Sequence, residues 1–101
     1  MTSAKILIHV DPDLLELAEP YLAKRKEEIS VLETSLQAGD HKAVQSLAHK
    51  MKGVAASYGF EELSRLGAEL ETAAKISNAE QMAQTLRQIR DYLSRVEIQK
   101  E

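Results

Sequence analysis

The chain has 101 residues, a net charge of −3 and 44% hydrophobic residues, which suits one domain built around one core. It has no cysteine, which excludes disulfide frameworks, thiolate zinc sites and cysteine nucleophiles, and only four aromatic residues with no tryptophan among them, too few for a base-stacking platform. The positive and negative charges are interspersed, and the sequence shows neither an export signal nor an apolar stretch of membrane-spanning length. We therefore expect a cytoplasmic protein that binds neither nucleic acid nor membrane.

The N-terminal part predicts two short elements before the main helices. Residues 1–10 are expected to form an extended lead-in. Asp11-Pro12 combines a capping aspartate with a proline at the first helical position, which predicts a short helix over 11–19. Pro20 lacks the amide that a continuing helix needs, so we expect the next helix to begin there and to end near Ala38.

Three further helices are predicted, at about 41–57, 60–76 and 79–97, because apolar residues recur there with a period of 3.6. Their expected core residues are Val44, Leu47, Ala48, Met51, Val54, Ala55 and Tyr58, then Leu63, Leu66, Gly67, Leu70, Ala73 and Ala74, then Met82, Leu86, Ile89, Leu93 and Val96. The short connections predict an all-α fold, an antiparallel up-and-down four-helix bundle over 20–97 with a short extra N-terminal helix, in one domain spanning 1–101.

Helical rotation predicts that His49 lies on the side of its helix that faces away from the core. At about 100° per residue the position falls almost opposite the apolar stripe of its helix, so we expect it to face solvent. An exposed histidine is most often ordinary solvated surface, and rotation alone leaves that interpretation open. The residues expected on the same side are Lys42, Gln45, Lys52, Gly53 and Ala56.

Gly53 favours a functional interpretation of this surface. A glycine inside a helix costs roughly 0.5–1 kcal/mol relative to alanine, and the core does not require one on the solvent side. The remaining reason is that a partner approaches the backbone beside His49. An imidazole that is largely neutral at pH 7 is a competent nucleophile, and Lys52 would neutralise the oxygens of an incoming phosphoryl group.

The segment Ala48-His49-Lys50-Met51-Lys52-Gly53, followed by Ala55, Ala56 and Gly59, resembles the signature of histidine-containing phosphotransfer (Hpt) domains. The family pattern has an apolar residue two positions after the histidine, then lysine, glycine, small residues and a second glycine. Leu63, Leu66, Leu70-Glu71 and Ala74 resemble the family's next helix, and the segment from Asp11-Pro12 to Gly39-Asp40 resembles its first helices. The likeness therefore covers nearly the whole chain.

The resemblance implies a phosphocarrier of two-component phosphorelays. His49 would accept a phosphoryl group on Nε2 from the aspartate of a receiver domain and pass it to another receiver domain. Lys52 would stabilise the phosphoryl group, Gly53 would permit close approach, and Glu71 would orient the imidazole. Lys75 matches a basic residue that some members carry one turn further on.

The resemblance also implies what binds the protein. The expected partners are receiver domains of response regulators and hybrid histidine kinases, and they would meet a monomer through Lys42, Gln45, Lys50, Gly53, Ala56 and Lys75. No cofactor is expected, because magnesium would sit in the receiver. The chain has no glycine-rich loop and is too short for a kinase domain, so we expect no ATP-dependent kinase activity.

Two alternatives stand beside this interpretation. The first is an interaction module that docks receiver or kinase domains without phosphotransfer, although a pure scaffold has no need for Gly53. The second, a metal- or cofactor-binding bundle, has little support, because the core stripes carry no inward set of histidines and glutamates. Lys50 departs from the bulkier apolar or neutral residue that many Hpt members carry there, and it adds positive charge beside His49.

Overall fold

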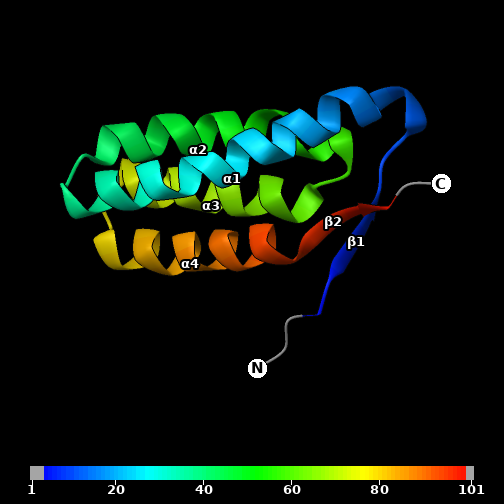
Figure 1. Ribbon diagram of the computed structural model, residues 1–101. Helices are drawn as coiled ribbons and strands as arrows, with labels where there is room; N and C mark the ends of the chain where they lie inside the picture. Colours follow the sequence, from blue (N-terminus) through cyan, green and yellow to red (C-terminus); the bar gives the residue numbers. More distant parts are fainter. Residues whose placement is uncertain (1–3, 100–101) are drawn as a thin grey trace.

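The computed structural model describes residues 4–99, and most of them are helical (Figure 1). Four long helices are joined by short connections, and two short strands lie at one end. The elements in chain order are β1 (Ile6–His9), the 3-10 turn η1 (Pro12–Leu14), α1 (Leu15–Gln37), α2 (His41–Ala55), the 3-10 turn η2 (Ala56–Tyr58), α3 (Glu61–Lys75), α4 (Ala79–Arg95) and β2 (Val96–Gln99).

Helix α1 runs without interruption through Pro20, so the prediction of a separate short helix over 11–19 was wrong. The Asp11 side chain accepts a hydrogen bond from the Asp13 amide, and the 3-10 turn that follows leads directly into α1. Ala18 and Leu22 are buried on either side of the proline. Packing of this continuous apolar face outweighs the single hydrogen bond that the proline removes.

The other helix boundaries follow from capping residues. Asp40 accepts a hydrogen bond from the Ala43 amide at the start of α2, and Asn78 accepts one from the Gln81 amide at the start of α4. After η2, Gly59 adopts a left-handed φ of +94°, a conformation that glycine reaches without a steric penalty. This turn reverses the chain between α2 and α3.

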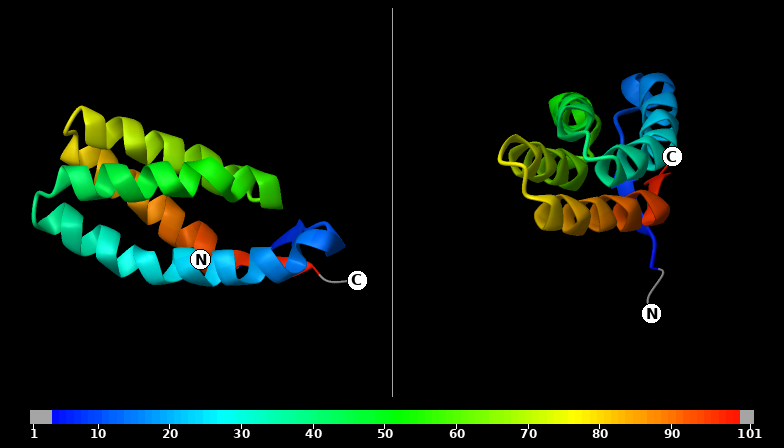
Figure 2. Two further views of the ribbon diagram at one scale, coloured as in Figure 1. Left: turned by 90° about the horizontal axis from the view of Figure 1, so that it is seen from above. Right: turned by 90° about the vertical axis from the view of Figure 1, so that its left-hand side faces the viewer.

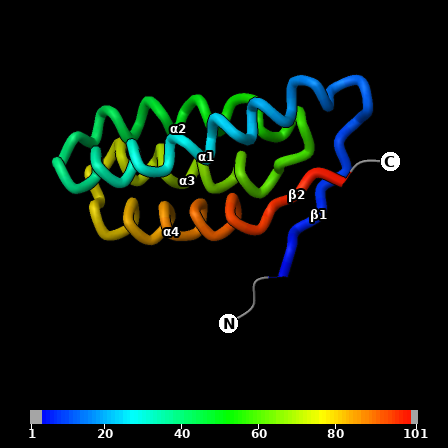
Figure 3. The backbone as a smooth tube through the Cα atoms, viewed as in Figure 1, coloured from blue at the N-terminus to red at the C-terminus, as the bar shows by residue number. Residues whose placement is uncertain are grey.

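The four helices surround one core. Each packs against the helix before and after it in the chain, and α1 also packs against α4. The view along the bundle in Figure 2 shows the four helices around a shared centre, and the tube in Figure 3 reverses direction at each connection. The predicted all-α character and the four long helices are therefore found, whereas the short extra N-terminal helix is part of α1 and a strand pair is present in addition.

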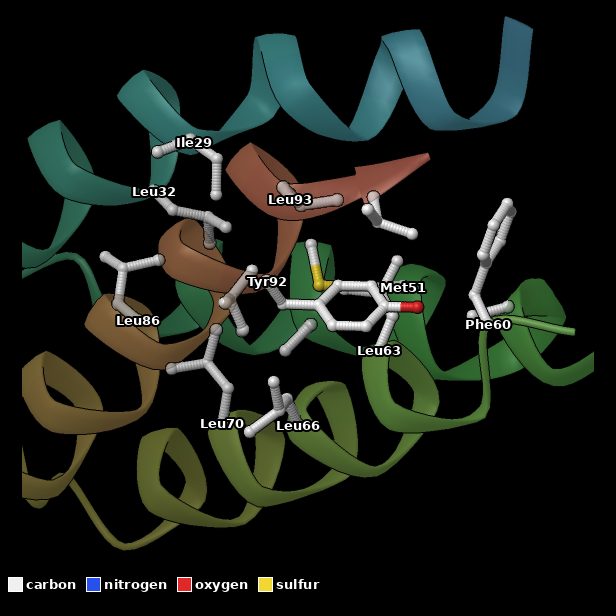
Figure 4. Packing of buried hydrophobic residues seen from close by; sticks show 14 of the residues in the cluster. Ile29, Leu32, Met51, Phe60, Leu63, Leu66, Leu70, Leu86, Tyr92 and Leu93 are labelled. Atoms are coloured by element: carbon white, nitrogen blue, oxygen red, sulfur yellow. The ribbon is translucent and has the colours of Figure 1, made fainter. Parts of the chain in front are cut away.

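The core consists mainly of aliphatic side chains from all four helices, with Met51 and Tyr92 among them and Phe60 at one end (Figure 4). Leu32, Met51, Leu63, Leu70 and Ile89 are all fully buried. The prediction that Val54 lies in the core was wrong, because this side chain is 43% exposed near the end of α2.

The two strands pair in parallel, with Ile6 opposite Val96 and Ile8 opposite Ile98. Of the extended lead-in predicted over 1–10, residues 6–9 form an ordered strand and residues 1–3 lie outside the described residues. The last helix ends at Arg95 rather than near 97. Val96 is buried at the end of the bundle as a strand residue. In the described residues, no helix is long and apolar enough to cross a membrane.

Candidate functional site

His49 lies on α2 with its side chain 67% exposed, on the solvent side that helical rotation predicts. Its Nδ1 is 2.9 Å from Oε2 of Glu71 on α3. An ionised carboxylate only accepts hydrogen bonds, so Nδ1 carries the hydrogen in this contact. In the neutral ring the lone pair is then on Nε2, which is the nitrogen available to an electrophile.

Glu71 is the buried member of the site, with 6% of its surface exposed. Its Oε1 is 2.7 Å from Nζ of Lys52, and its Oε2 is 4.0 Å from Nζ of Lys75. The hydrogen bond from Lys52, with a further one from His49, lowers the pKa of Glu71 in spite of the opposing effect of desolvation. The carboxylate is therefore ionised at neutral pH and holds the imidazole in one tautomer.

Lys52 lies one turn after His49, and its side chain is 38% exposed. Its ammonium group is bound to the same carboxylate that binds the imidazole. The two side chains therefore stand next to each other at the surface. A phosphoryl group on the imidazole would have a cation beside it.

Gly53 and Ala56 are exposed and continue this surface along α2. A Cβ atom placed on Gly53 would meet nothing within 4 Å. The fold itself therefore has no steric need for glycine here. The open space lies beside His49, where a partner would have to approach.

A shallow hollow of about 490 Å³ lies on the other side of His49, toward the N-terminus of α2. Lysines 42, 50 and 75 line it together with Gln45, Ser46 and Glu71. The structure thus brings Lys42, Gln45, Lys50 and Lys75 to His49. Ser46 was missed, although it lies one turn before His49 and helical spacing alone places it there.

The other two histidines lie elsewhere. His41 is the first residue of α2, and His9 is in β1. Within residues 4–99, no three histidine, cysteine, aspartate or glutamate side chains form a group that could hold a metal ion.

The family model of the Hpt domain matches residues 16–99, which is most of the chain. The chain belongs to the Hpt domain family. Hpt domains act as phosphotransfer carriers in phosphorelays and interact with receiver domains. No curated protein and no solved structure matches the chain.

An exposed position on a helix surface suits a phosphotransfer carrier better than a deep pocket. A carrier must present the same nitrogen to more than one partner protein. The exposed His49, with one ring nitrogen held by Glu71, meets this requirement. The matched region includes His49 and all the residues that surround it here.

Proposed function

We propose that this Hpt domain accepts a phosphoryl group on Nε2 of His49 from the aspartyl phosphate of one receiver domain and passes it to the aspartate of another. The observation that carries the proposal is the bridging of the His49 ring and the Lys52 ammonium by one buried carboxylate, that of Glu71. This arrangement leaves Nε2 free and places a cation next to it.

In the transfer step, the Nε2 lone pair attacks phosphorus in line with the aspartyl oxygen. The N–P bond forms as the P–O bond breaks, and the receiver carboxylate leaves with the electron pair. The ring then carries both the phosphoryl group and the Nδ1 hydrogen, and Glu71 stabilises the resulting positive charge. Lys52 neutralises negative charge on the phosphoryl oxygens.

The return step is the same reaction in reverse, with a receiver aspartate as the nucleophile. Magnesium belongs to the receiver in this proposal, and the Hpt domain contributes only its own side chains. Lysines 42, 50 and 75 around the hollow favour an acidic partner surface. The monomeric state and the cytoplasmic location stay predictions.

The decisive experiment incubates the protein with a phosphorylated receiver and measures acid-labile phosphate on the Hpt domain. We expect His49→Gln to abolish labelling. His41→Gln is the matched control, because it changes another histidine of α2 and is expected to label like the wild type. Stoichiometric labelling of His49→Gln would contradict the proposal.

The second candidate is a module that docks receiver domains without phosphotransfer. It is favoured by the open surface at Gly53 and Ala56, which suits docking whether or not phosphate moves. The same experiment separates the two, because such a module would bind the receiver and remain unlabelled even as the wild type.

A further inference from the structure

Three residues on one face of α3 contact a short stretch of α2 around the site. Ser64, Gly67 and Glu71 are spaced so that they lie along one stripe of the helix. Glu71 binds the side chains of His49 and Lys52. The other two contact main-chain atoms of the same stretch.

Ser64 binds the backbone of Lys52. Its Oγ donates a hydrogen bond to the Lys52 carbonyl oxygen at 2.9 Å. In a continuing α-helix this carbonyl would accept from the Ala56 amide, but that amide points to the Val54 carbonyl as the chain tightens into η2. The Ser64 hydroxyl thus satisfies a carbonyl at the end of α2 from a different helix.

Gly67 lets the two helices approach at the same residue. A Cβ atom on Gly67 would lie 2.9 Å from the Lys52 nitrogen and 3.2 Å from the Ala48 carbonyl oxygen. Both are main-chain atoms of α2, which cannot rotate away as a side chain can. Any larger residue at position 67 therefore forces α3 away from α2.

Glu71 lies one turn after Gly67 on α3, and its reach to the site depends on this spacing. Its hydrogen bonds of 2.9 Å to His49 and 2.7 Å to Lys52 leave little tolerance for a shift of the helix. A displacement of about 1 Å lengthens both contacts beyond good hydrogen-bond geometry.

We infer that Ser64 and Gly67 are positioning residues for phosphotransfer, because they fix α3 against the Lys52 backbone and so hold Glu71 at His49 and Lys52. The inference rests on the proposed function for its effect on transfer. Neither residue touches the reacting atoms. They act through Glu71, which sets the tautomer of the His49 ring.

The test measures the His49 ring by long-range proton–nitrogen NMR and, separately, the single-turnover rate of transfer from a phosphorylated receiver. In Gly67→Ala we expect the nitrogen shifts to move toward a mixture of tautomers and the transfer rate to fall by about tenfold at most, the loss expected when Glu71 itself is removed, with receiver affinity unchanged. In Ser64→Ala the nitrogen shifts and the transfer rate are expected to change in the same directions, by smaller amounts. Ser64→Thr keeps the hydroxyl and is expected to give wild-type nitrogen shifts and a wild-type transfer rate.

Two matched controls separate positioning from general loss of stability. Ser94→Ala removes a hydroxyl that also donates to a backbone carbonyl, that of Asp91, but within α4. Gly39→Ala strains a backbone with a φ of +74° at the α1–α2 turn, where a Cβ meets nothing within 4 Å. Both are expected to keep the wild-type ring spectrum.

Wild-type ring shifts in both Ser64→Ala and Gly67→Ala would overturn the inference, whatever the transfer rates. If Gly67→Ala does not fold, the comparison of Ser64→Ala with Ser64→Thr alone tests the inference. The ring measurement needs no receiver, so a wild type that accepts no phosphate would contradict the proposed function while leaving the positioning of the ring open to this test.

Discussion

The Lys52 ammonium lies 2.7 Å from the buried carboxylate of Glu71, whose second oxygen accepts a hydrogen bond from Nδ1 of His49. One acidic group on α3 thus connects two basic groups on α2. Because both basic groups share one acceptor, a change in any of the three side chains alters the surroundings of the other two.

Replacing Glu71 separates its two roles. Glu71→Gln keeps an oxygen that can accept from Nδ1 but removes the charge that holds Lys52, whereas Glu71→Ala removes both. We expect transfer to slow on the order of tenfold in Glu71→Ala and less in Glu71→Gln, as for other groups that orient a reactive imidazole. Single-turnover rates measure this, and equal rates in the wild type and Glu71→Ala would contradict it.

The lowered pKa of Glu71 predicts a pH dependence of stability. The folded-state value lies below the ordinary 4.5, chiefly because of the hydrogen bond from Lys52. The resulting stabilisation is fully present above about pH 4.5 and is lost as the pH falls through the folded-state pKa.

Urea unfolding at several pH values checks this dependence. The difference in unfolding free energy between the wild type and Glu71→Gln is expected to shrink as the pH falls from 4.5 through the folded-state pKa of Glu71. A carboxyl titration of Glu71 by NMR with a midpoint above 4.5 would show that the direction is wrong.

Lys52 and Lys75 differ in their distance from Glu71, at 2.7 Å and 4.0 Å, and in exposure. We expect Lys52→Ala to slow transfer by about 10²-fold, in the range seen when a group that stabilises transition-state charge is removed, with little change in receiver affinity. Lys75→Ala is the comparison variant, with a smaller loss expected. Transfer rates and receiver affinities measured with the same receiver test this. A larger loss of transfer rate in Lys75→Ala than in Lys52→Ala would assign the stabilisation of the phosphoryl group to Lys75 instead.

Gly53 should be replaceable without harm to the fold. Gly53→Ala is expected to raise the free energy of unfolding by about 0.5–1 kcal/mol, since the site is open and alanine favours a helix. Gly53→Glu is expected to fold normally but to weaken receiver binding through its bulk and charge. Denaturant unfolding and receiver titration measure the two effects, and wild-type affinity in Gly53→Glu would remove the close-approach argument.

Pro20 is expected to weaken α1. Pro20→Ala restores an amide within the helix and removes the ring, so we expect stabilisation of about 1–3 kcal/mol, less the entropy that proline removes from the unfolded chain. Thermal and urea unfolding test this. A destabilised variant would mean that the proline ring makes contacts worth more than the hydrogen bond it removes.

The sequence predicted the helices well where local signals agree with packing. Asp40 and Asn78 cap helices that begin close to their expected positions. Pro20 was misleading, because its local cost is overridden by the apolar face on both sides of it. Val96 was assigned to a helix because its partner, Ile6, lies at the other end of the sequence and leaves no local trace.

Some residues of the site could be predicted from the sequence, and others could not. Rotation and spacing placed His49, Lys52 and Gly53 on one surface of a single helix. Glu71 came only from the resemblance to Hpt domains, since a contact between α2 and α3 cannot be read from either helix alone. The sequence assigned no role to Ser64. Gly67 is buried, as predicted, but its close approach to α2 was not predictable, because the atoms that it and Ser64 meet belong to the main chain of α2.

The pairing of β1 with β2 joins the two most distant parts of the described sequence. The main helix contacts are between neighbours along the chain, apart from those of α1 with α4, and such local contacts form quickly during folding. The strand pair requires closure of nearly the whole chain into a loop, which costs entropy. This cost is small only after the packed helices have brought the two strands close together. We therefore expect the strand pair to form last on the folding pathway and to lengthen the lifetime of the native state, slowing unfolding with little effect on the folding rate.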